Sequence, residues 1–322
     1  MDPRGIVLGG LSFVLASTAV SCSDDSTAPN GGAAAGSGGS AGSGLIIPVN
    51  DAASDSPGPW QLPPGFTPGT RGGYKLGDPV GSGAAGAAGA TDGGAGQGGG
   101  CGTIVTGVLR DFKGYGEDGA DTGHQDFEDW CCGDDLDIVD SPLGADKKPP
   151  YKNAGGATPS THGKDLFDQW YRSVDGVNKP YYLQIALQVT DPAKNIATFE
   201  SSAFFPVDNA GFGNAGNNHN FHFTTELHLQ FRYNGQETFK FTGDDDVFVY
   251  VNSHLAINLG GVHGAEDQTI ELDDHAQEFG ISKGNVYDLD LFHAERHTSE
   301  SNFRIDTTLE FVNCGTIVPD PH

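Results

Sequence analysis

Basic side chains are scarce in this chain of 322 residues. Lysine and arginine together number 17, against 43 aspartates and glutamates, so the formal net charge at pH 7 is −26. A surface with this balance repels nucleic acid and the anionic faces of membranes. We therefore expect no nucleic-acid partner, whereas divalent cations and neutral polymers such as polysaccharides are compatible with the charge.

The sequence also lacks the motifs that mark several classes of enzyme and metal site. We find no serine nucleophile elbow, P-loop or dinucleotide fingerprint in the strand-to-helix setting that each requires. The five cysteines include no CxxC pair, which argues against a zinc site built on cysteine. These absences favour a binding or structural role, and we do not expect an enzyme.

The start of the chain is apolar, but only briefly. The apolar run Ile6–Leu15 is too short to cross a bilayer comfortably, and small residues follow it up to Cys22. This order predicts a signal peptide over residues 1–21 and export of the chain. Residues 19–22 (AVSC) resemble a bacterial lipobox, which implies a lipoprotein acylated at Cys22 and held at the cell surface, on the outer membrane. Ordinary signal cleavage nearby is the alternative.

Residues 22–100 are mostly of low complexity. The runs 31–44 and 81–100 consist almost entirely of Gly, Ala and Ser, which cannot bury enough apolar surface to offset the entropy of folding. We expect a disordered tether there. Residues 45–80 are richer in proline and contain Trp60, Phe66 and Tyr74. We expect an extended spacer in this part, with docking on the main domain as the alternative.

From Cys101 onward the composition is that of a globular domain. Many short apolar alternations, without regularly alternating helices, predict an all-β antiparallel sandwich or barrel over residues 101–314, with residues 315–322 as a tail. One helix is expected at 164–173, where Leu166, Phe167, Trp170 and Tyr171 fall on one face. The expected strands are 104–112, 136–139, 181–189, 196–205, 221–233, 239–241, 247–251, 254–259, 268–272, 286–293 and 302–312.

Four cysteines remain if Cys22 is acylated. Cys131 and Cys132 are adjacent, and adjacent cysteines form a disulfide with each other only in a strained geometry. Each is therefore expected to pair with Cys101 or Cys314, in either of two connectivities. Such pairing fits an oxidising compartment.

An acidic turn interrupts the strand pattern between Phe241 and Val247. Asp244, Asp245 and Asp246 follow Gly243 directly, and three adjacent carboxylates repel one another unless a cation or several donors neutralise them. Clustered oxygen ligands suit a hard cation such as Ca²⁺. Asp and Gly also form ordinary solvated turns, so chemistry alone leaves both interpretations open.

Four blocks of sequence, in the same order, resemble the fibro-slime domain, a relative of the PA14 module found in exported bacterial and surface proteins. They are VLRDF at 108–112, GHQDFED at 123–129, GDDDVFVYVN with LGGVHG within 243–264, and FHAERHTSESNFRIDTTLEF at 292–311. The resemblance covers about residues 101–314 and implies a PA14-like antiparallel β-sandwich.

The resemblance also implies a function. In PA14-type lectins and adhesins, two consecutive aspartates joined by a cis peptide hold Ca²⁺, and the ion binds sugar hydroxyls. We therefore expect a calcium-dependent module for carbohydrate binding or adhesion, with a polysaccharide or cell-surface glycan as partner and self-association as a further possibility. The candidate metal ligands are Asp244, Asp245, Asp246, Asn252, Glu295 and Asn302, and the candidate ligand-binding residues are Arg296 and His263. Arg296 would pair either with a sugar hydroxyl or with a carboxylate.

Two other functions stay open. Asp126 and Glu128 lie two residues apart, as the general acid and base of an exported polysaccharide hydrolase would, and they are also candidates for further cation ligands. The same block is equally readable as structural, with Phe127 and Trp130 in the core. A purely structural envelope protein, stiffened by calcium, is the third possibility.

Overall fold

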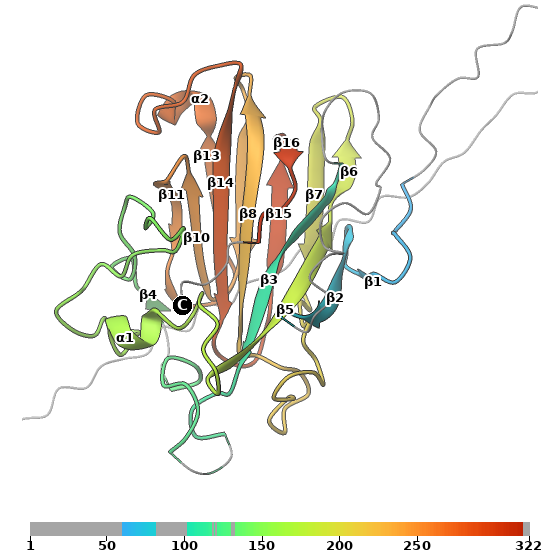
Figure 1. Ribbon diagram of the computed structural model, residues 1–322. Coiled ribbons are helices and arrows are strands. Elements are labelled where there is room, and N and C mark those ends of the chain that lie inside the picture. Colours follow the sequence, from blue (N-terminus) through green and yellow to red (C-terminus); the bar gives the residue numbers. More distant parts are fainter. Residues whose placement is uncertain (1–59, 82–101, 118, 120, 130–132, 318–322) are drawn as a thin grey trace, which may run out of the picture. The chain divides into compact units, whose positions relative to one another are not determined.

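Two antiparallel β-sheets make up most of the structure (Figure 1). The structure is a computed structural model that describes residues 60–81, 102–117, 119, 121–129 and 133–317. In spatial order the larger sheet comprises β1 (Thr67–Pro68), β2 (Gly73–Pro79), β5 (Asn178–Ala186), β3 (Ile104–Phe112), β8 (Phe223–Tyr233), β14 (Asn285–Glu295), β10 (Asp246–Val251) and β11 (His254–Leu259), with β16 (Glu310–Asn313) also paired to β8.

The second sheet and the remaining elements are smaller. The second sheet contains, in order, β13 (Glu266–Glu271), β9 (Thr238–Gly243), β15 (Phe303–Thr307), β7 (Ile196–Ser201) and β6 (Gln188–Asp191). A short pair joins β12 (Gly261–Val262) to β4 (Gly133–Asp134), and the helices are α1 (Lys164–Phe167) and α2 (Leu272–His275). None of the described helices is long and apolar enough to cross a membrane. The predicted all-β antiparallel sandwich is confirmed.

The main core lies between the two sheets. Alternate residues of each strand point into it, among them Val247 and Val249 of β10 and Phe239 and Phe241 of β9. At roughly 25 cal/mol per Å² of buried apolar surface, a core of this kind supplies the main driving force for folding.

A second core covers the outer face of the larger sheet. Phe248 and Tyr250, which alternate with Val247 and Val249 along β10, pack there against Phe292. Side chains from loops in the 113–177 segment, such as Trp170, belong to the same core. The green loops that carry α1 lie beside β10 and β11 in Figure 1. The period-two pattern predicted one buried face for β10, but all six of its residues are buried because this loop layer covers the other.

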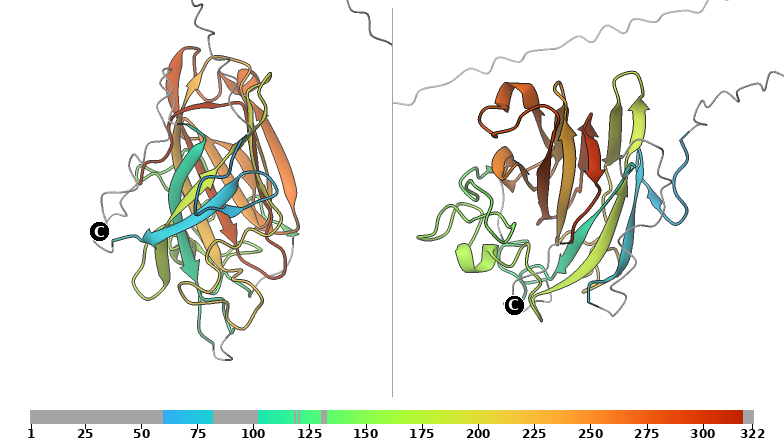
Figure 2. Two further views of the ribbon diagram at one scale, coloured as in Figure 1. Left: turned by 90° about the vertical axis from the view of Figure 1, so that its right-hand side faces the viewer. Right: turned by 45° about the horizontal axis from the view of Figure 1, so that its top comes forward.

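The proline-containing segment before the main domain belongs to the sheet. β2 pairs with β5 and carries β1 at the sheet edge (Figure 2), and Tyr74 is buried against Phe199 and Phe204. The spacer predicted for residues 45–80 is therefore wrong over β1 and β2, and the docking alternative holds there. Backbone pairing with β2 covers the edge that β5 would otherwise expose, while Tyr74 and Leu76, at alternate positions of β2, pack against the core.

Three further expectations differ from the structure. Residues 136–139 form no strand, and Leu136 is exposed. The helix expected over 164–173 is regular only over Lys164–Phe167, although Trp170 and Tyr171 are buried as predicted. The tail expected from residue 315 begins against the larger sheet, because the Thr316 amide donates to the His228 carbonyl.

Several predictions fall outside the described residues. These are the signal peptide, acylation of Cys22, and the tether over residues 22–59 and 82–100. Cys101, Cys131 and Cys132 also lie outside, so the pairing of the cysteines stays a prediction. Cys314 lies next to the start of the domain, with its Sγ 3.7 Å from the Gly102 carbonyl oxygen.

Loops from both sheets meet at one end of the sandwich. In the larger sheet, β3 and β14 end where β8 and β10 begin. In the second sheet, β7 and β9 end where β15 begins. The acidic turn, the 296–302 loop, the 113–129 loops and the 202–222 loop therefore emerge together.

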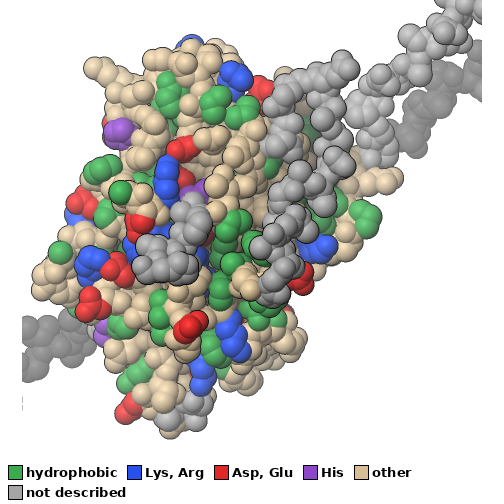
Figure 3. Space-filling model, viewed as in Figure 1, with side chains coloured by type: hydrophobic (Ala, Val, Ile, Leu, Met, Phe, Trp, Pro, Cys, Tyr) green, Lys and Arg blue, Asp and Glu red, His purple; other side chains and the backbone are tan. Residues whose placement is uncertain are grey.

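Charge on the visible face is mixed. In Figure 3, acidic and basic side chains are interspersed over the strands and loops. Acidic clusters at particular places therefore carry more information about function than the net charge does.

Candidate functional site

The acidic turn crosses from one sheet to the other. Gly243 ends β9 in the second sheet and Asp246 begins β10 in the larger one, so Asp244 and Asp245 span the gap. The peptide bond between them is cis, as the family resemblance predicted. A side chain at Gly243 would meet the Asn302 carbonyl oxygen at 2.6 Å, so the turn lies tightly against the 296–302 loop.

The carboxylate of Asp244 is held by that loop. It accepts hydrogen bonds from the Asn302 amide at 2.5 Å and from Asn302 Nδ2 at 2.7 Å. The Asp244 carbonyl accepts from His293 Nε2 at 2.8 Å, and burial lowers the pKa of His293 to about 4. A neutral histidine therefore supports the turn from inside the core.

The Asp245 carboxylate has fewer partners. Its Oδ2 accepts from the Arg296 backbone amide at 2.9 Å. Burial raises the pKa of Asp245 to about 7, and burial likewise raises the pKa of Asp244. Both carboxylates thus lie where a negative charge is poorly stabilised by the protein alone.

A hollow opens beside the two carboxylates. It has a volume of about 220 Å³ and lies between the acidic turn, residues 262–264 and the 297–300 segment. The Thr298–Ser299 peptide bond in its wall is also cis. The lining residues are Asp244, Asp245, Val262, His263, Gly264, His297, Thr298, Ser299 and Glu300.

Glu295 adds a third carboxylate beneath the pair. It is 1% exposed, and neither of its oxygens has a hydrogen-bond partner among the described residues. Burial, followed by the charges of Asp245 and Asp244, raises the pKa of Glu295 well above its usual value. A bound cation would relieve this cluster, and oxygen-rich surroundings are those that hard cations prefer.

The cluster is not a complete set of metal ligands. Within the part of the chain that the structure describes, no three His, Cys, Asp or Glu side chains converge as a ready-made metal site. A cation at Asp244 and Asp245 would accordingly complete its coordination with amide or backbone oxygens, water or a bound molecule.

Asp246 and Arg296 form a buried ion pair. Arg296 Nε and Nη2 donate to the two Asp246 oxygens at 2.5 and 3.1 Å, the Gly261 amide donates to Oδ1, and neither side chain is exposed. The guanidinium also lies 4.7 Å from the ring centroid of Trp170. The predicted metal-ligand role of Asp246 and ligand contact of Arg296 are therefore wrong, because both side chains are used inside the protein.

The other predicted site residues divide into two groups. Asn302 contacts Asp244, His263 lines the hollow, and Glu295 lies below the pair. Asn252 is elsewhere: it follows the far end of β10, about 20 Å from Asp246 at the usual rise of a strand. Its Nδ2 donates to the Phe279 carbonyl, so its proposed ligand role is also wrong.

The carboxylates of the GHQDFED block have structural contacts. Asp126 is 1% exposed and accepts from the His162 backbone amide and from Trp170 Nε1. Glu128 accepts from His222 and Thr298. Neither residue lines the pocket beside this block, so the acid and base roles predicted for them do not fit.

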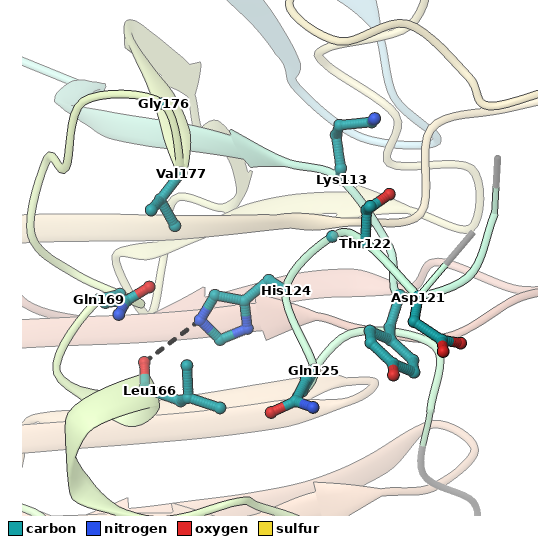
Figure 4. A pocket seen from close by; sticks show the side chains of 11 residues that line it. Lys113, Asp121, Thr122, His124, Gln125, Leu166, Gln169, Gly176 and Val177 are labelled. Atoms are coloured by element: carbon teal, nitrogen blue, oxygen red, sulfur yellow. Dashed lines mark hydrogen bonds between the residues drawn. The ribbon is translucent and has the colours of Figure 1, made fainter.

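That pocket is formed partly by residues 123–125 of the same block (Figure 4). It has a volume of about 450 Å³, and Asp121 is its one lining carboxylate. His124 forms part of the wall, with a ring nitrogen 3.2 Å from the Leu166 carbonyl, and burial lowers its pKa to about 4. The described lining residues thus offer no pair of carboxylates for glycoside hydrolysis.

Sequence reasoning missed two contributors to the site. Thr298 was not singled out, and Glu128 was considered as an acid or base, as a cation ligand or as part of a structural block, but not as a partner of the 296–302 loop. His293 carried a usable signal: it shares the inward parity of Leu289 and Leu291 on β14, and a histidine at a core position needs a partner.

Comparison with known proteins identifies the fold family. The family model of the PA14 domain matches residues 160–321, which include the acidic turn and the hollow. The chain belongs to the PA14 domain family. This domain is a binding module of the carbohydrate-binding and adhesion type, found in adhesins and as part of glycosidases.

Several curated relatives of this PA14 protein are psi proteins of Dictyostelium discoideum. Protein psiQ is 37% identical over 55% of this chain and 19% of its own length, and protein psiC is 36% identical over 55% of this chain and 37% of its own length. The chain thus spans less than two fifths of either relative.

Solved structures show weaker similarity. The PA14 domain of the MpAFP antifreeze protein is 9% identical, with a TM-score of 0.24, over 40% of this chain and 78% of that one. A beta-glucosidase from Kluyveromyces marxianus, solved in complex with glucose, is 16% identical, with a TM-score of 0.20, over 27% of this chain and 10% of that one.

Proposed function

We propose that this PA14 domain binds Ca²⁺ at the cis Asp244–Asp245 pair and uses the ion to hold hydroxyl groups of a carbohydrate. The observation that carries the proposal is the pair of buried carboxylates at the edge of an open hollow, above the unpartnered Glu295. The carboxylates of Asp244 and Asp245, with the Asn302 side chain beside them, would hold the ion. Ca²⁺ would supply open coordination positions for vicinal hydroxyls.

The rim of the hollow supports a polar ligand. His263, His297, Thr298 and Glu300 place hydrogen-bonding groups around the opening. Polar groups that converge on a concave site fix the orientation of a ligand. No chemical step is required, so the domain acts as a binding module.

We further propose that the module works at the cell surface of its source. The apolar start, Cys22 and the Gly-rich runs support an exported, lipid-anchored protein of fibro-slime type, tethered on the outer membrane. A polysaccharide or surface glycan, or a second copy of the protein through such a glycan, would be its partner. The alternative is a structural domain that calcium stabilises and that binds no sugar, because the same carboxylates would hold the ion in that case too.

Calorimetric titration tests the cation site. Full-length protein is stripped with a chelator and titrated with Ca²⁺, beside the Asp244→Asn, Asp245→Asn double variant. A matched control replaces Asp273 and Asp274 by Asn, since these are an adjacent acidic pair exposed on α2. We expect saturable binding by the parent and the control and none by the site variant; equal binding by all three would refute the site.

A glycan array then tests the ligand. With Ca²⁺ present, the parent should bind one class of glycan, and chelator or the site variant should abolish the signal. Calcium binding without any glycan signal would favour the structural alternative.

A further inference from the structure

We propose that Glu128 is a positioning residue for the cation site: it fixes the loop that forms one wall of the hollow and thereby sets cation affinity. This inference rests on the proposed function and adds a residue that neither the acidic turn nor the hollow contains.

Glu128 holds the 296–302 loop at Thr298 through its side chain and at Arg296 through its backbone. Its Oε1 accepts from Thr298 Oγ1 at 3.0 Å, and its Oε2 accepts from the Thr298 amide at 3.2 Å. Its own backbone amide donates to the Arg296 carbonyl at 2.7 Å. Arg296 in turn donates from Nη1 to the Asp126 carbonyl. Hydrogen bonds therefore run in both directions between the 126–128 segment and the 296–298 segment.

Buried side chains support Glu128 from behind. His222 is 3% exposed, and its Nε2 donates to Glu128 Oε2 at 2.9 Å. The other ring nitrogen lies 3.3 Å from Oε2 of Glu117, whose carboxylate also accepts from the Gly114 amide. Phe127 next to Glu128 is buried and stacks on Phe112 of β3, with ring centroids 4.4 Å apart.

Glu128 acts on the hollow through the 296–302 loop. Thr298 and His297, whose Nε2 lies 3.8 Å from Glu128 Oε1, line the hollow, whereas Glu128 does not. The same loop orients the proposed ligands, because its Arg296 amide donates to Asp245 and its Asn302 side chain donates to Asp244. Partners that orient the ligands of a metal site change affinity without touching the ion, and their loss usually weakens binding about 10- to 100-fold. We therefore expect Glu128 to affect affinity more than it affects folding.

A double-variant cycle tests this. Calcium affinity of the full-length protein is measured by calorimetry for the parent, Glu128→Gln, Thr298→Val and the double variant. Thr298→Val removes the hydroxyl donor and keeps the side-chain shape, so it serves if Glu128→Gln fails to fold. Glu310→Gln is the matched control, because Glu310 is exposed on β16 and pairs with Arg232, at the end of β8 that lies away from the hollow.

We expect Glu128→Gln to lower affinity about tenfold and Thr298→Val to lower it severalfold. The double variant should lose no more than Glu128→Gln alone, because both changes break one connection. Glu310→Gln should stay within about threefold of the parent. Thermal unfolding in chelator separates affinity from stability.

Three results would overturn the proposal. Parental affinity in Glu128→Gln or in Thr298→Val would show that the connection does not matter. Additive losses in the double variant would show that the residues act independently. Absence of calcium binding in the parent would remove the proposed function itself, which distinguishes that failure from the other two.

Discussion

Asp244, Asp245 and Asp246 follow one another in the chain, yet each carboxylate has different surroundings. The period-two pattern of β10 places Asp246 on the outer face with Phe248 and Tyr250, where the loop layer buries it. Sequence alone predicts that parity. It does not predict Arg296 as the partner, since that contact joins residues 50 positions apart. The cis bond was predictable only from the family resemblance.

His222 provides a test of charge at the residue scale. Burial alone would lower its pKa, but hydrogen bonds and charges from Glu117 and Glu128 raise it to about 9. A histidine whose pKa is higher in the folded state stabilises fully below its unfolded value near 6.5, and this stabilisation is lost as pH rises through about 9. The maximum contribution is about 3 kcal/mol.

Urea unfolding of the parent and of His222→Gln at several pH values measures this contribution. The difference in unfolding free energy should be largest near pH 6 and should shrink by pH 9.5. His275→Gln is the control, since that side chain is 42% exposed on α2. A difference that stays constant with pH would contradict the assignment.

At the scale of elements, strands of the larger sheet were the most predictable. β3 and β11 have the bounds that alternation predicted, because apolar and polar side chains point to opposite faces of a strand. β2 was missed because its few apolar residues are surrounded by Gly and Pro, which are typical of spacers. The loop layer over β10 was missed because irregular segments leave no periodic pattern.

Tyr74 tests whether β2 is part of the folded domain. Replacing it by Ala should lower the free energy of unfolding by about 3 kcal/mol, because a buried aromatic ring in contact with Phe199 and Phe204 would leave a cavity. Lys75→Ala on the same strand is the control, since Lys75 is exposed, and it should change stability by less than about 0.5 kcal/mol. Equal free energies of unfolding for the two variants would show that this segment is not part of the folded domain.

At the scale of the whole molecule, the cation site couples ligand concentration to stability. An ion that binds only the folded state at 100 times its dissociation constant adds about 2.7 kcal/mol to the free energy of unfolding. We expect the melting temperature of the parent to rise with Ca²⁺ and to fall on chelation. The Asp244→Asn, Asp245→Asn variant should show no dependence, and a parallel rise in that variant would place the ion elsewhere.

The place of β1 and β2 at the edge of the larger sheet has a mechanical consequence. A pull on the chain before residue 60 enters the folded domain through β1, the outermost strand, and then through β2. Such a load peels hydrogen-bonded pairs from the edge one after another, while β10 and β14 beside the hollow lie several strands away. The β1–β2 hairpin would therefore unfold first under tension and lengthen the connection before the domain. The strands beside the hollow would stay folded, and the ligand would stay bound.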